Sequence, residues 1–578
     1  MQRTFRVSGG KMNLNFSIVL IVKNEEKTLP KMLDSLKEFR ERGGEIVICD
    51  TGSKDNTVKI ARDYGCVTEE VREKFIKIIT KELAQKINRK FSVNEGDIVK
   101  FGDKLFDFAS ARNYAASLAS NDLISNQDAD EEYTKLDIDK VCDFINQGYD
   151  QFEYNFVFSH DQFGNEAIKF VQSKFYNRRK MQWEGIVHEV LQPLVSGEIK
   201  RLFLDESIIK LEHWQNPTTS RGAYLKGLAV DCFQNPNKDR QSHYFARELL
   251  WCGKPKSAIK EFEHHIAMNR WKAEMAQSMI FIGDANGQLN QGDKQIEWYH
   301  KAFVLDSSRR ESLIRLAHFF RARNEPQKVA CYIAAAMEIP WVPFYANYRN
   351  HYTNEPHELM YWARGWLGDI EGAKYHILKA LEYQPYNRIY LEHTKYYFEY
   401  PDNLIEGWMR FPELLWLYET AKKMNTIAEA GSWKGKSTHA LCSGCKSGTV
   451  TAIDHFLGSE EEKEFQHKEA VGDIVYNQFM ENMKRFNNLR VNRKDIVEAA
   501  KDYPDKYFDM TFLDGGHTYE QVKADILAWL PKTKKLICGH DYTPNLWNGV
   551  VKAVDEVIGK VQVVDSIWFK FLEEERDV

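Results

Sequence analysis

Carboxylates crowd into one short segment of the chain, NQDADEEY at residues 126–133, directly after the apolar pair Leu123-Ile124. Residues i and i+2 of an extended chain point to the same side, so we expect Asp128 and Asp130 to face one divalent cation. Oxygen ligands suit Mg²⁺ or Mn²⁺, and these ions commonly bridge to substrate phosphates. The segment therefore indicates a metal site that faces a phosphate, with a solvated turn as the alternative interpretation.

A second segment could also take part in catalysis. It is FYNRRKMQWEGIVHEVL at residues 175–191, which combines an aromatic residue, basic residues and a His-Glu pair. Trp183 could stack on a sugar, and Glu189 could act as the general base that takes a hydroxyl or thiol proton. His188, or His213 in the later run LEHWQN, could complete the metal shell. Two alternatives stay open: Glu189 only orients the histidine beside it, or His213 belongs to a packed aromatic cluster.

Two further polar positions could bind a nucleotide. Asp50 ends the apolar run EIVICD and could accept a hydrogen bond from a nucleobase, with capping of the following helix as the alternative. Arg112 and Asn113 could contact a carboxylate or a diphosphate, because guanidinium groups pair well with such anions.

Glycines shape the motif AEAGSWKGKSTHALC at residues 428–442, which follows an apolar run and opens a helix. Gly431 and Gly435 would let the backbone approach a ligand closely, next to a helix N-terminus. The spacing GSWKGKS lacks the gap between glycines that a phosphate-binding loop needs, so we exclude an ATP site of that kind.

Acids and histidines follow the later strand-like runs of the same region. Asp454 ends the run TVTAID, and an acid in this position can bind a ribose diol. Asp514 and His517 follow the run MTFL, and His540 and Asp541 follow LICG. All of them lie where α/β sheets place their ligands.

The order of apolar runs and helical patterns predicts two α/β regions. In residues 14–215, the strand-like runs SIVLIV and EIVICD alternate with a helical stretch whose Leu29, Leu33 and Leu36 share one face. In residues 404–578, the strand candidates are NTIAEAG, GTVTAID, FDMTFLD and KLICGHD. Alternation of strands and helices predicts parallel sheets with ligands at the carboxyl ends of the strands.

Residues 217–400 are predicted to be helical. Helix-compatible segments are separated by short turns, at spacings near the roughly 34-residue repeat of helical hairpins. We expect a short tetratricopeptide-like (TPR-like) array, with an irregular helical bundle as the alternative. Such arrays usually present a concave binding surface. The turns begin at Gly253, Gly292, Asn324 and Gly368.

Length and composition limit the class of protein. The 578 residues exceed one ordinary core and predict about three or four domains. A formal charge of −5 argues against binding polyanions through bulk charge. The N-terminal stretch lacks a signal-peptide core, and no run of about 18 apolar residues predicts a spanning helix. Nine scattered cysteines, including the pair Cys442 and Cys445, indicate reduced thiols and a cytoplasmic protein.

The N-terminal motifs together resemble the family 2 glycosyltransferases of the GT-A fold. The resemblance covers about residues 14–215, in order through SIVLIVKNEEKTLPKMLDSL, EIVICDTGSKDNTVKIA, FDFASARNYAASLA, DADEEY and WEGIVHE. It is strongest toward the subgroup in which TPR-like helices follow the transferase, as in bacteriocin S-glycosyltransferases. The segment 68–104 looks longer than this region usually is, so access of the acceptor could differ.

This resemblance implies a Mn²⁺- or Mg²⁺-dependent transfer from a nucleotide sugar (UDP-, GDP- or dTDP-linked), which we expect to invert the anomeric centre. It implies Asp128 and Asp130 as metal ligands, to which we add His213. It places His188 and Glu189 beside the acceptor, in catalytic roles. The expected nucleotide-sugar-binding residues are Asn24, Glu25, Asp50, Ser53, Asp55, Arg112, Asn113, Asp128 and Trp183.

The C-terminal motifs resemble the class I S-adenosylmethionine (SAM)-dependent methyltransferases over about residues 424–560, with the patterns E-x-G-x-x-x-G-x-S and D-G-x-H-x-Y-E…H-D. Similar sugar O-methyltransferases imply a divalent metal on Asp514 and Asp541, which would bind vicinal sugar hydroxyls, and His517 as the base. Gly516 departs from the pattern, because some of these enzymes carry a second Asp there. Loop bracing by His517 and His540 is the alternative. The expected SAM-binding residues are Glu429, Gly431, Ser432, Gly435 and Asp454.

These expectations combine into an α/β multidomain protein: a GT-A domain at 14–215, a TPR-like helical domain at 217–400 and a Rossmann-like methyltransferase domain at 404–578. We expect a bifunctional glycan-modifying enzyme that transfers a sugar and O-methylates a sugar hydroxyl. The alternative is a peptide or protein glycosyltransferase whose helices recruit the acceptor and whose C-terminal domain is a non-catalytic binding module. Modification of nucleobases in DNA is a third hypothesis, which the near-neutral composition disfavours; nucleic acid is not an expected partner.

Overall fold

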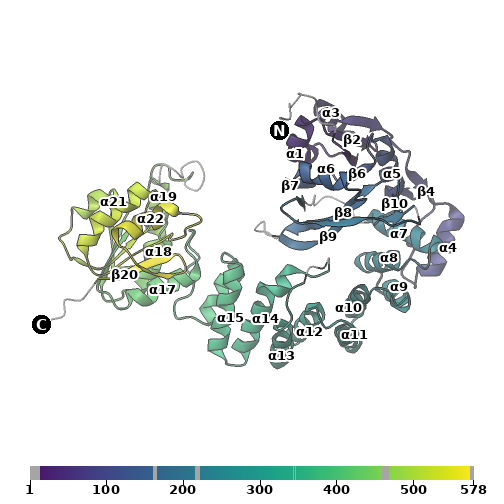
Figure 1. The fold of residues 1–578 in the computed structure, drawn as a ribbon. Coiled ribbons are helices and arrows are strands. Elements are labelled where there is room, and N and C mark those ends of the chain that lie inside the picture. The colour runs from purple at the N-terminus through teal and green to yellow at the C-terminus, as the bar shows by residue number, and fades with distance from the viewer. Residues whose placement is uncertain are drawn as a thin grey trace, which may run out of the picture. The chain divides into compact units, whose positions relative to one another are not determined.

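The computed structural model of the protein describes residues 14–160, 166–194, 196–214, 222–342, 344, 346–458 and 468–572. The chain divides into two compact units, residues 1–352 and 353–578. Each unit holds one large sheet, and helices occupy the sequence between the two sheets (Figure 1). The predicted mixed α/β fold class is confirmed. The boundary between the units falls inside the predicted helical region, so the three-domain division stays a prediction.

The sheet of the first unit has the strand order β3-β2-β1-β6-β9-β8-β13-β7, with β12 paired to β8. Strands β3, β2, β1 and β6 run parallel, whereas β9 joins β6 in the antiparallel sense. The strands are β1 (Phe16–Val22), β2 (Glu45–Asp50), β3 (Val67–Glu70), β6 (Leu123–Gln127), β7 (Glu131–Leu136), β8 (Gln151–His160), β9 (Glu166–Asn177), β12 (Arg201–Leu204) and β13 (Ile209–His213). The parallel half brings the ends of β1, β2 and β6 to one edge, as predicted.

Helices cover both faces of this sheet, which explains the near-continuous apolar sequence of its central strand. Ile18 and Leu20 of β1 pack into one core together with Leu33. Val19 points to the opposite face and packs with Ala115. The helices are α1 (Leu29–Ser35), α2 (Lys37–Glu41), α3 (Thr57–Asp63), α5 (Phe108–Leu118) and α6 (Ile138–Asn146).

The long segment 68–104 links the sheet to the helices that follow it. It contains a helix and two short strands that pair in the antiparallel sense. Ile87 and Phe91 share a core with Leu228 and Phe245 of later helices, and the two phenylalanine rings lie 4.9 Å apart. Its elements are β4 (Ile76–Ile78), α4 (Lys81–Phe91) and β5 (Lys104–Phe106).

Consecutive helices pack side by side through the rest of the first unit, as expected of a helical-hairpin array (Figure 1). Pro255 and Pro326 stand in the first turns of two of them, where a missing N–H costs nothing. The helices are α7 (Gly222–Gln234), α8 (Asp239–Trp251), α9 (Pro255–Ala267), α10 (Lys272–Gln288), α11 (Gly292–Leu305), α12 (Glu311–Arg321) and α13 (Pro326–Met337). The second unit begins with a similar pair, α14 (Asn354–Trp366) and α15 (Ile370–Tyr383), followed by α16 (Arg388–His393).

The sheet of the second unit has the order β16-β15-β14-β17-β18-β20-β19. Strands β16 to β18 of this order are parallel, and β20 is antiparallel to β18. Connections leave β14 and β17 in opposite directions, which opens a crevice at their carboxyl ends. The elements around it are β14 (Thr426–Ala430), β15 (Thr449–Ile453), β16 (Leu489–Asn492), β17 (Phe508–Leu513), β18 (Thr533–Gly539), β19 (Gln562–Val564), β20 (Ile567–Phe571), α17 (Phe411–Ala421), α18 (Lys436–Gly444), α19 (Ile474–Met483), α20 (Ile496–Ala500), α21 (Tyr519–Trp529) and α22 (Asn548–Val557).

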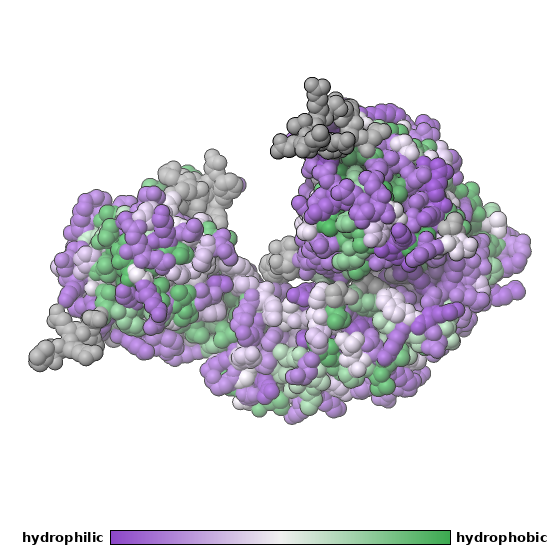
Figure 2. All heavy atoms as spheres, in the orientation of Figure 1, coloured by the Kyte–Doolittle hydropathy of each residue, from purple (hydrophilic) through white to green (hydrophobic). Residues whose placement is uncertain are grey.

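Apolar residues are broken up by polar ones over the surface. Figure 2 shows apolar residues in separate patches among hydrophilic ones on the face in view. Across the described ranges, no helix has the length and apolar character that crossing a membrane requires. The nine cysteines are free, and Cys442 and Cys445 are buried thiols.

Substitution of Gly431 tests how closely the loops after β14 and β17 approach each other. It has a left-handed φ of 93°, and an added Cβ would lie 1.9 Å from the backbone oxygen of Asp514. Gly472 is also left-handed, with a φ of 59°, but has open space around its Cα. We expect Gly472→Ala to cost about 1–2 kcal/mol of conformational strain and Gly431→Ala several times more. Calorimetric unfolding measures both, and equal losses would contradict the close approach of the two loops.

Candidate active sites

The loops after β1 and β2 interlock and bring the predicted nucleotide-binding residues together. Asn24 has a left-handed φ of 59°; its N–H donates to Ser53 Oγ (2.8 Å) and its Oδ1 accepts from the N–H of Lys54 (2.8 Å). The N–H of Glu26 donates to Asp55 Oδ2 over 3.2 Å. These bonds fix a rigid rim at the carboxyl ends of the two strands.

Asp50 is buried at the end of β2 and holds its own loop. Its carboxylate accepts hydrogen bonds from the backbone N–H groups of Gly52 and Ser53. Helix α3 has Asn56 as its N-cap residue, so the helix-capping alternative for Asp50 is wrong. Contact of Asp50 with a nucleobase stays a prediction.

Negative charge concentrates beside this rim. Burial raises the pKa of Glu25, Thr28 lowers it through a hydrogen bond of 2.7 Å, and the carboxylates of Asp130, Asp128 and Asp55 raise it further. A group of acids this close favours binding of a cation.

The segment 128–130 is a turn, in which the N–H of Glu131 donates to the carbonyl oxygen of Asp128 over 3.1 Å. The expectation of an extended chain was therefore wrong, whereas a shared ion for the two aspartates stays a prediction. Arg112 Nη2 lies 2.7 Å from Asp128 Oδ1, and Lys174 Nζ lies 2.8 Å from Oδ2. Burial raises the pKa of Asp128, but these two cations outweigh it and hold the pKa well below its usual value. Both carboxylate oxygens of Asp128 are thus engaged in ion pairs.

Asp130 and His213 form the corner that fits a metal ion. His213 Nδ1 lies 2.9 Å from the carbonyl oxygen of Phe158, which requires an N–H there and leaves Nε2 facing Asp130 Oδ2 at 3.1 Å. Burial lowers the pKa of His213, but Asp130 outweighs it and raises the pKa overall. A proton on Nε2, or a divalent ion in its place, satisfies both groups. The ring also stacks on Phe158, so the aromatic packing foreseen as an alternative coexists with the acid pairing.

Arg112 connects this corner to the predicted base. It is 5 % exposed, and its Nε donates to Glu189 Oε1 over 2.6 Å while Nη2 binds Asp128. Its Nη1 is buried and has no hydrogen-bond partner among the residues described. Lys174, which sequence reasoning missed, also binds Glu131 Oε1 at 2.5 Å. A lone lysine in strand β9 carries no spacing signal that could have marked it.

The helical array contributes to the same site. His188 lies in the loop between β10 (Met181–Glu184) and β11 (Val190–Pro193), with a left-handed φ of 51°. Its ring stacks on Tyr244 of α8, with centroids 4.3 Å apart, and Arg247 Nη2 lies 3.3 Å from Nε2. Arginine only donates, so Nε2 accepts in this contact. Sequence reasoning missed Tyr244 and Arg247 because nothing local links α8 to this loop.

Trp183 and Asn113 are positioning residues. The indole of Trp183 is 7 % exposed and donates to Asn126 Oδ1 (2.9 Å) and the Tyr176 hydroxyl (3.0 Å). The side-chain amide of Asn113 bonds both the N–H and the carbonyl oxygen of Trp183. The expectation that Trp183 stacks on a sugar was wrong, because the ring is packed in the core behind the site.

The second candidate site starts from a backbone cradle after β14. Asp454 Oδ2 accepts from the N–H groups of Ser432 (2.8 Å) and Trp433 (2.9 Å), which ties the loops after β14 and β15 together. Gly435 is left-handed, with a φ of 91°, and starts helix α18. The close approach of Gly431 to Asp514 completes a floor of backbone groups.

Glu429 lies buried beneath this cradle. Ser432 Oγ (2.8 Å) and Thr438 Oγ1 both donate to its Oε2. Its Oε1 is buried without a hydrogen-bond partner in the part of the chain that the structure describes. Burial raises the pKa of Glu429 to about 7. An unused carboxylate oxygen below a glycine cradle fits a ligand with ammonium and hydroxyl donors, such as SAM.

Acids and histidines meet at the ends of β17 and β18. One ligand atom each from Asp514, His540 and Asp541 lies within 4.8 Å of the others, a spacing that could hold a metal ion. His517 Nε2 lies 2.8 Å from Asp541 Oδ2, and its ring stacks on Trp547. The structure thus places the predicted Asp514 and Asp541 close together, and His540 is a third possible metal ligand beside them. These residues border a small cavity of about 20 Å³.

His540 also faces the interior, where its Nε2 lies 3.2 Å from Glu413 Oε2. Burial lowers the pKa of His540, but Asp514, Asp541 and Glu413 outweigh it and raise the pKa well above the usual value. The same cavity is bordered by Asp525, a carboxylate that sequence reasoning missed. Burial raises the pKa of Asp525 to about 7.

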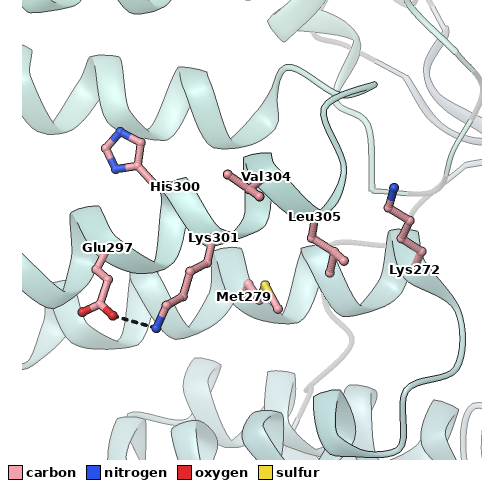
Figure 3. Close-up of a pocket in the computed structure, with 7 residues that line it drawn as sticks. All are labelled: Lys272, Met279, Glu297, His300, Lys301, Val304 and Leu305. Atoms are coloured by element: carbon pink, nitrogen blue, oxygen red, sulfur yellow. Dashed lines mark ion pairs between the residues drawn. The ribbon is translucent and has the colours of Figure 1, made fainter.

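A larger pocket of about 750 Å³ lies on the helical array, between α10 and α11. Figure 3 shows aliphatic side chains there, with one ion pair between Glu297 and Lys301. The lining also carries His300, whose Nδ1 contacts the carbonyl oxygen of Ile296 and whose Nε2 contacts the hydroxyl of Tyr332.

Comparison with known families matches part of each unit. Residues 17–83 match glycosyl transferase family 2, and residues 428–542 match a methyltransferase domain. The predicted family resemblance of both ends of the chain is therefore confirmed, and both matches describe transferases.

Similar proteins cover only parts of the chain. An uncharacterised protein of Sinorhizobium fredii is 30% identical over 143 residues, which span 23% of this chain and 15% of that protein. A TPR repeat-containing protein of Synechococcus elongatus is 24% identical over 208 residues, which span 36% of this chain and 42% of that protein. The chain thus spans less than half the length of either relative.

Solved structures of TPR proteins are also similar. YrrB, a TPR protein with an unusual peptide-binding site, shows 13% identity and a TM-score of 0.24 over 30% of this chain and 81% of that one. The pilF protein of Pseudomonas aeruginosa shows 11% identity and a TM-score of 0.25 over 30% of this chain and 73% of that one.

The buried Glu429 makes the stability of the second unit depend on pH. Its folded pKa of about 7 lies above the ordinary value of 4.5, so the folded state holds the proton more tightly than the unfolded chain. This contribution is complete below about pH 4.5 and is lost as the pH rises to about 7. We expect wild type to lose up to about 3 kcal/mol relative to Glu429→Gln between pH 5 and 8.

Denaturant unfolding of both proteins across this pH range measures the difference. Glu520→Gln, at an exposed position of α21, is the matched control and should follow the wild-type curve. A constant difference between wild type and Glu429→Gln would show that Glu429 is ionised throughout.

Proposed function

We propose that the protein is a bifunctional glycan-modifying transferase. Its first unit transfers a sugar from a nucleotide sugar to an acceptor, and its second unit transfers a methyl group from SAM to a sugar hydroxyl. The observation that carries the proposal is a set of three ion pairs. Asp130 pairs with His213, and Arg112 pairs with both Asp128 and Glu189. The first pair is the candidate metal site, and Glu189 is the candidate base. The nine free cysteines favour a reducing compartment, and we propose the cytoplasm.

In sugar transfer, the acids at the ends of β1, β2 and β6 bind the donor. Asp130 and His213 would hold a Mn²⁺ or Mg²⁺ ion, which neutralises the leaving diphosphate when it is bound. Arg112 holds Glu189 through Oε1, so that Oε2 can accept the proton of the acceptor's hydroxyl or thiol. Asn24, Ser53 and Asp55 hold the loops that surround the nucleotide. Inversion at the anomeric carbon is part of the proposal.

In methyl transfer, SAM supplies an electrophilic methyl group on its sulfonium. Glu429 and the 431–435 loop would bind the cofactor from below. Asp514, His540 and Asp541 would hold a divalent ion that binds the sugar hydroxyls. Asp541 orients His517 through Nε2, and His517 would take the hydroxyl proton.

A second candidate function is glycosylation of a peptide or protein that the helices recruit. It is favoured by the contacts of Tyr244 and Arg247 with His188, which bring the helical array to the acceptor side of the first site. In this version the second unit is a binding module. Failure of the second unit to bind SAM would favour it.

Nucleotide release tests the first activity. With Mn²⁺ and a panel of UDP-, GDP- and dTDP-linked sugars, we expect slow hydrolysis of one donor by wild type. Asp130→Asn should lower this rate about 100-fold or more, because it removes the charge that holds the ion against the diphosphate. Asp541→Asn is the control and should keep the wild-type rate.

Each outcome has a clear meaning. Loss of release in Asp130→Asn alone supports the metal corner. Equal rates in Asp130→Asn and wild type would refute the role of this aspartate. If no donor binds at all, the transferase proposal for the first unit fails.

Methylation tests the second activity with the same two variants. Asp541→Asn is now the test variant and Asp130→Asn is the control. We expect wild type to bind SAM in calorimetry and to methylate the glycosylated product in a metal-dependent way. Asp541→Asn should keep SAM affinity within about twofold and lose at least about 100-fold in methyl transfer, because the ion and His517 lose their shared partner. Undiminished methyl transfer in this variant would contradict the proposed site.

A further inference from the structure

Three metal-ligating side chains from three helices meet inside the helical array, away from both sites above. Asp239 is the first residue of α8, His265 lies in the last turn of α9, and Glu274 lies in the first turn of α10. One ligand atom from each lies within 4.8 Å of the others. His265 and Glu274 are buried, and Asp239 is half-buried, so the group is not a chance cluster of surface acids.

His265 is set up as a ligand. Its ring is 1 % exposed, and its Nε2 is buried without a hydrogen-bond partner among the described residues. Nε2 lies 3.9 Å from Glu274 Oε2, which is too long for a hydrogen bond. Two ligands at about 2.1 Å from one tetrahedral Zn²⁺ are about 3.4 Å apart, so small side-chain rotations would bring this pair onto one ion.

The other ring nitrogen of His265, Nδ1, contacts a hydroxyl group that a second histidine shares. His265 Nδ1 lies 2.9 Å from Ser278 Oγ, and the same hydroxyl lies 2.8 Å from His243 Nδ1. A hydroxyl has one proton, so at least one of the two rings must donate its own N–H to Ser278. When His265 is the donating ring, its N–H is on Nδ1 and the lone pair of Nε2 faces the carboxylates of Asp239 and Glu274.

We propose that Asp239, His265 and Glu274 bind one divalent transition-metal ion that joins helices α8, α9 and α10. Two carboxylates and one imidazole nitrogen gathered within 4.8 Å of one another attract a divalent cation. One imidazole and two carboxylates are a ligand set that suits Zn²⁺, with water in the remaining position. The hydrogen bond between Nδ1 and Ser278 Oγ is the kind of second contact that orients metal-bound histidines.

The position of the ion gives it a consequence for the first site. Helix α8 carries Asp239 at its start and, one to two turns later, Tyr244 and Arg247, which contact His188. An ion at the start of α8 fixes the helix that supports the loop of the predicted acceptor site. This consequence rests on the proposed function, whereas the metal site itself does not.

Metal binding by the full-length protein tests the proposal. After removal of bound metal by a chelator, Zn²⁺ is titrated in by calorimetry and bound zinc is counted by mass spectrometry. We expect wild type to bind one Zn²⁺ more than His265→Gln or Glu274→Gln, and Asp239→Asn to bind that ion at least about tenfold more weakly. His264→Gln, which changes the neighbouring histidine at a side chain that is 44% exposed, is the matched control and should equal wild type.

Zinc bound by the group at the end of β18 is distinguished from zinc bound by the helical array with a separate variant. Asp541→Asn alters the group at the end of β18 and should leave the difference between wild type and His265→Gln unchanged. The Asp239→Asn change is at a half-buried helix start, so this variant is expected to fold even if the two buried changes do not. Zinc stoichiometry and affinity equal to wild type in Asp239→Asn and in a folded His265→Gln or Glu274→Gln would overturn the proposal, whatever the transferase assays show.

Discussion

The buried guanidinium of Arg112 is the constraint on which the first site depends. Arg112 comes from helix α5, and it must be compensated by Asp128 after β6 and Glu189 before β11. Taking a charge out of water costs several kcal/mol, and removing one partner of such a pair typically costs about 3–5 kcal/mol. The ion pairs therefore lock three parts of the chain in one arrangement. Asp128 serves this lock, whereas Asp130 pairs with His213.

The second site is held in place by backbone conformation and hydrogen bonds rather than by buried ion pairs. Gly431, Trp433, Gly435 and Asp541 all adopt left-handed φ values at the carboxyl ends of its strands. Such conformations cost free energy and persist where the surrounding structure enforces them, as it does at ligand sites. The cost is offset by Asp454, whose carboxylate collects the N–H groups of the cradle. What results is a floor of backbone close enough to contact a cofactor.

The helical array is part of the first unit's core rather than an appendage. The segment 68–104, long by comparison with the resembled family, packs Ile87 and Phe91 against helices α7 and α8. Tyr244 and Arg247 of α8 then reach His188 in the loop between β10 and β11. The array thus supports the acceptor side of the sheet, and the proposed ion at the start of α8 would stiffen that support. An acceptor bound by the helices would lie next to a loop that they already hold.

The sequence alone determined the features that depend on local order. Strand ends follow from apolar runs and turn residues, so Asp130, Gly431, Asp514 and Asp541 could be assigned to sheet edges from spacing. Only the tertiary structure decided what each side chain faces. Asp128 pairs with Lys174, which lies 46 residues away, and Trp183 is buried against Asn126. His265 meets acids from two other helices in the same way. Burial and pairing across such distances depend on how elements pack, which the spacing of residues along one strand or helix does not encode.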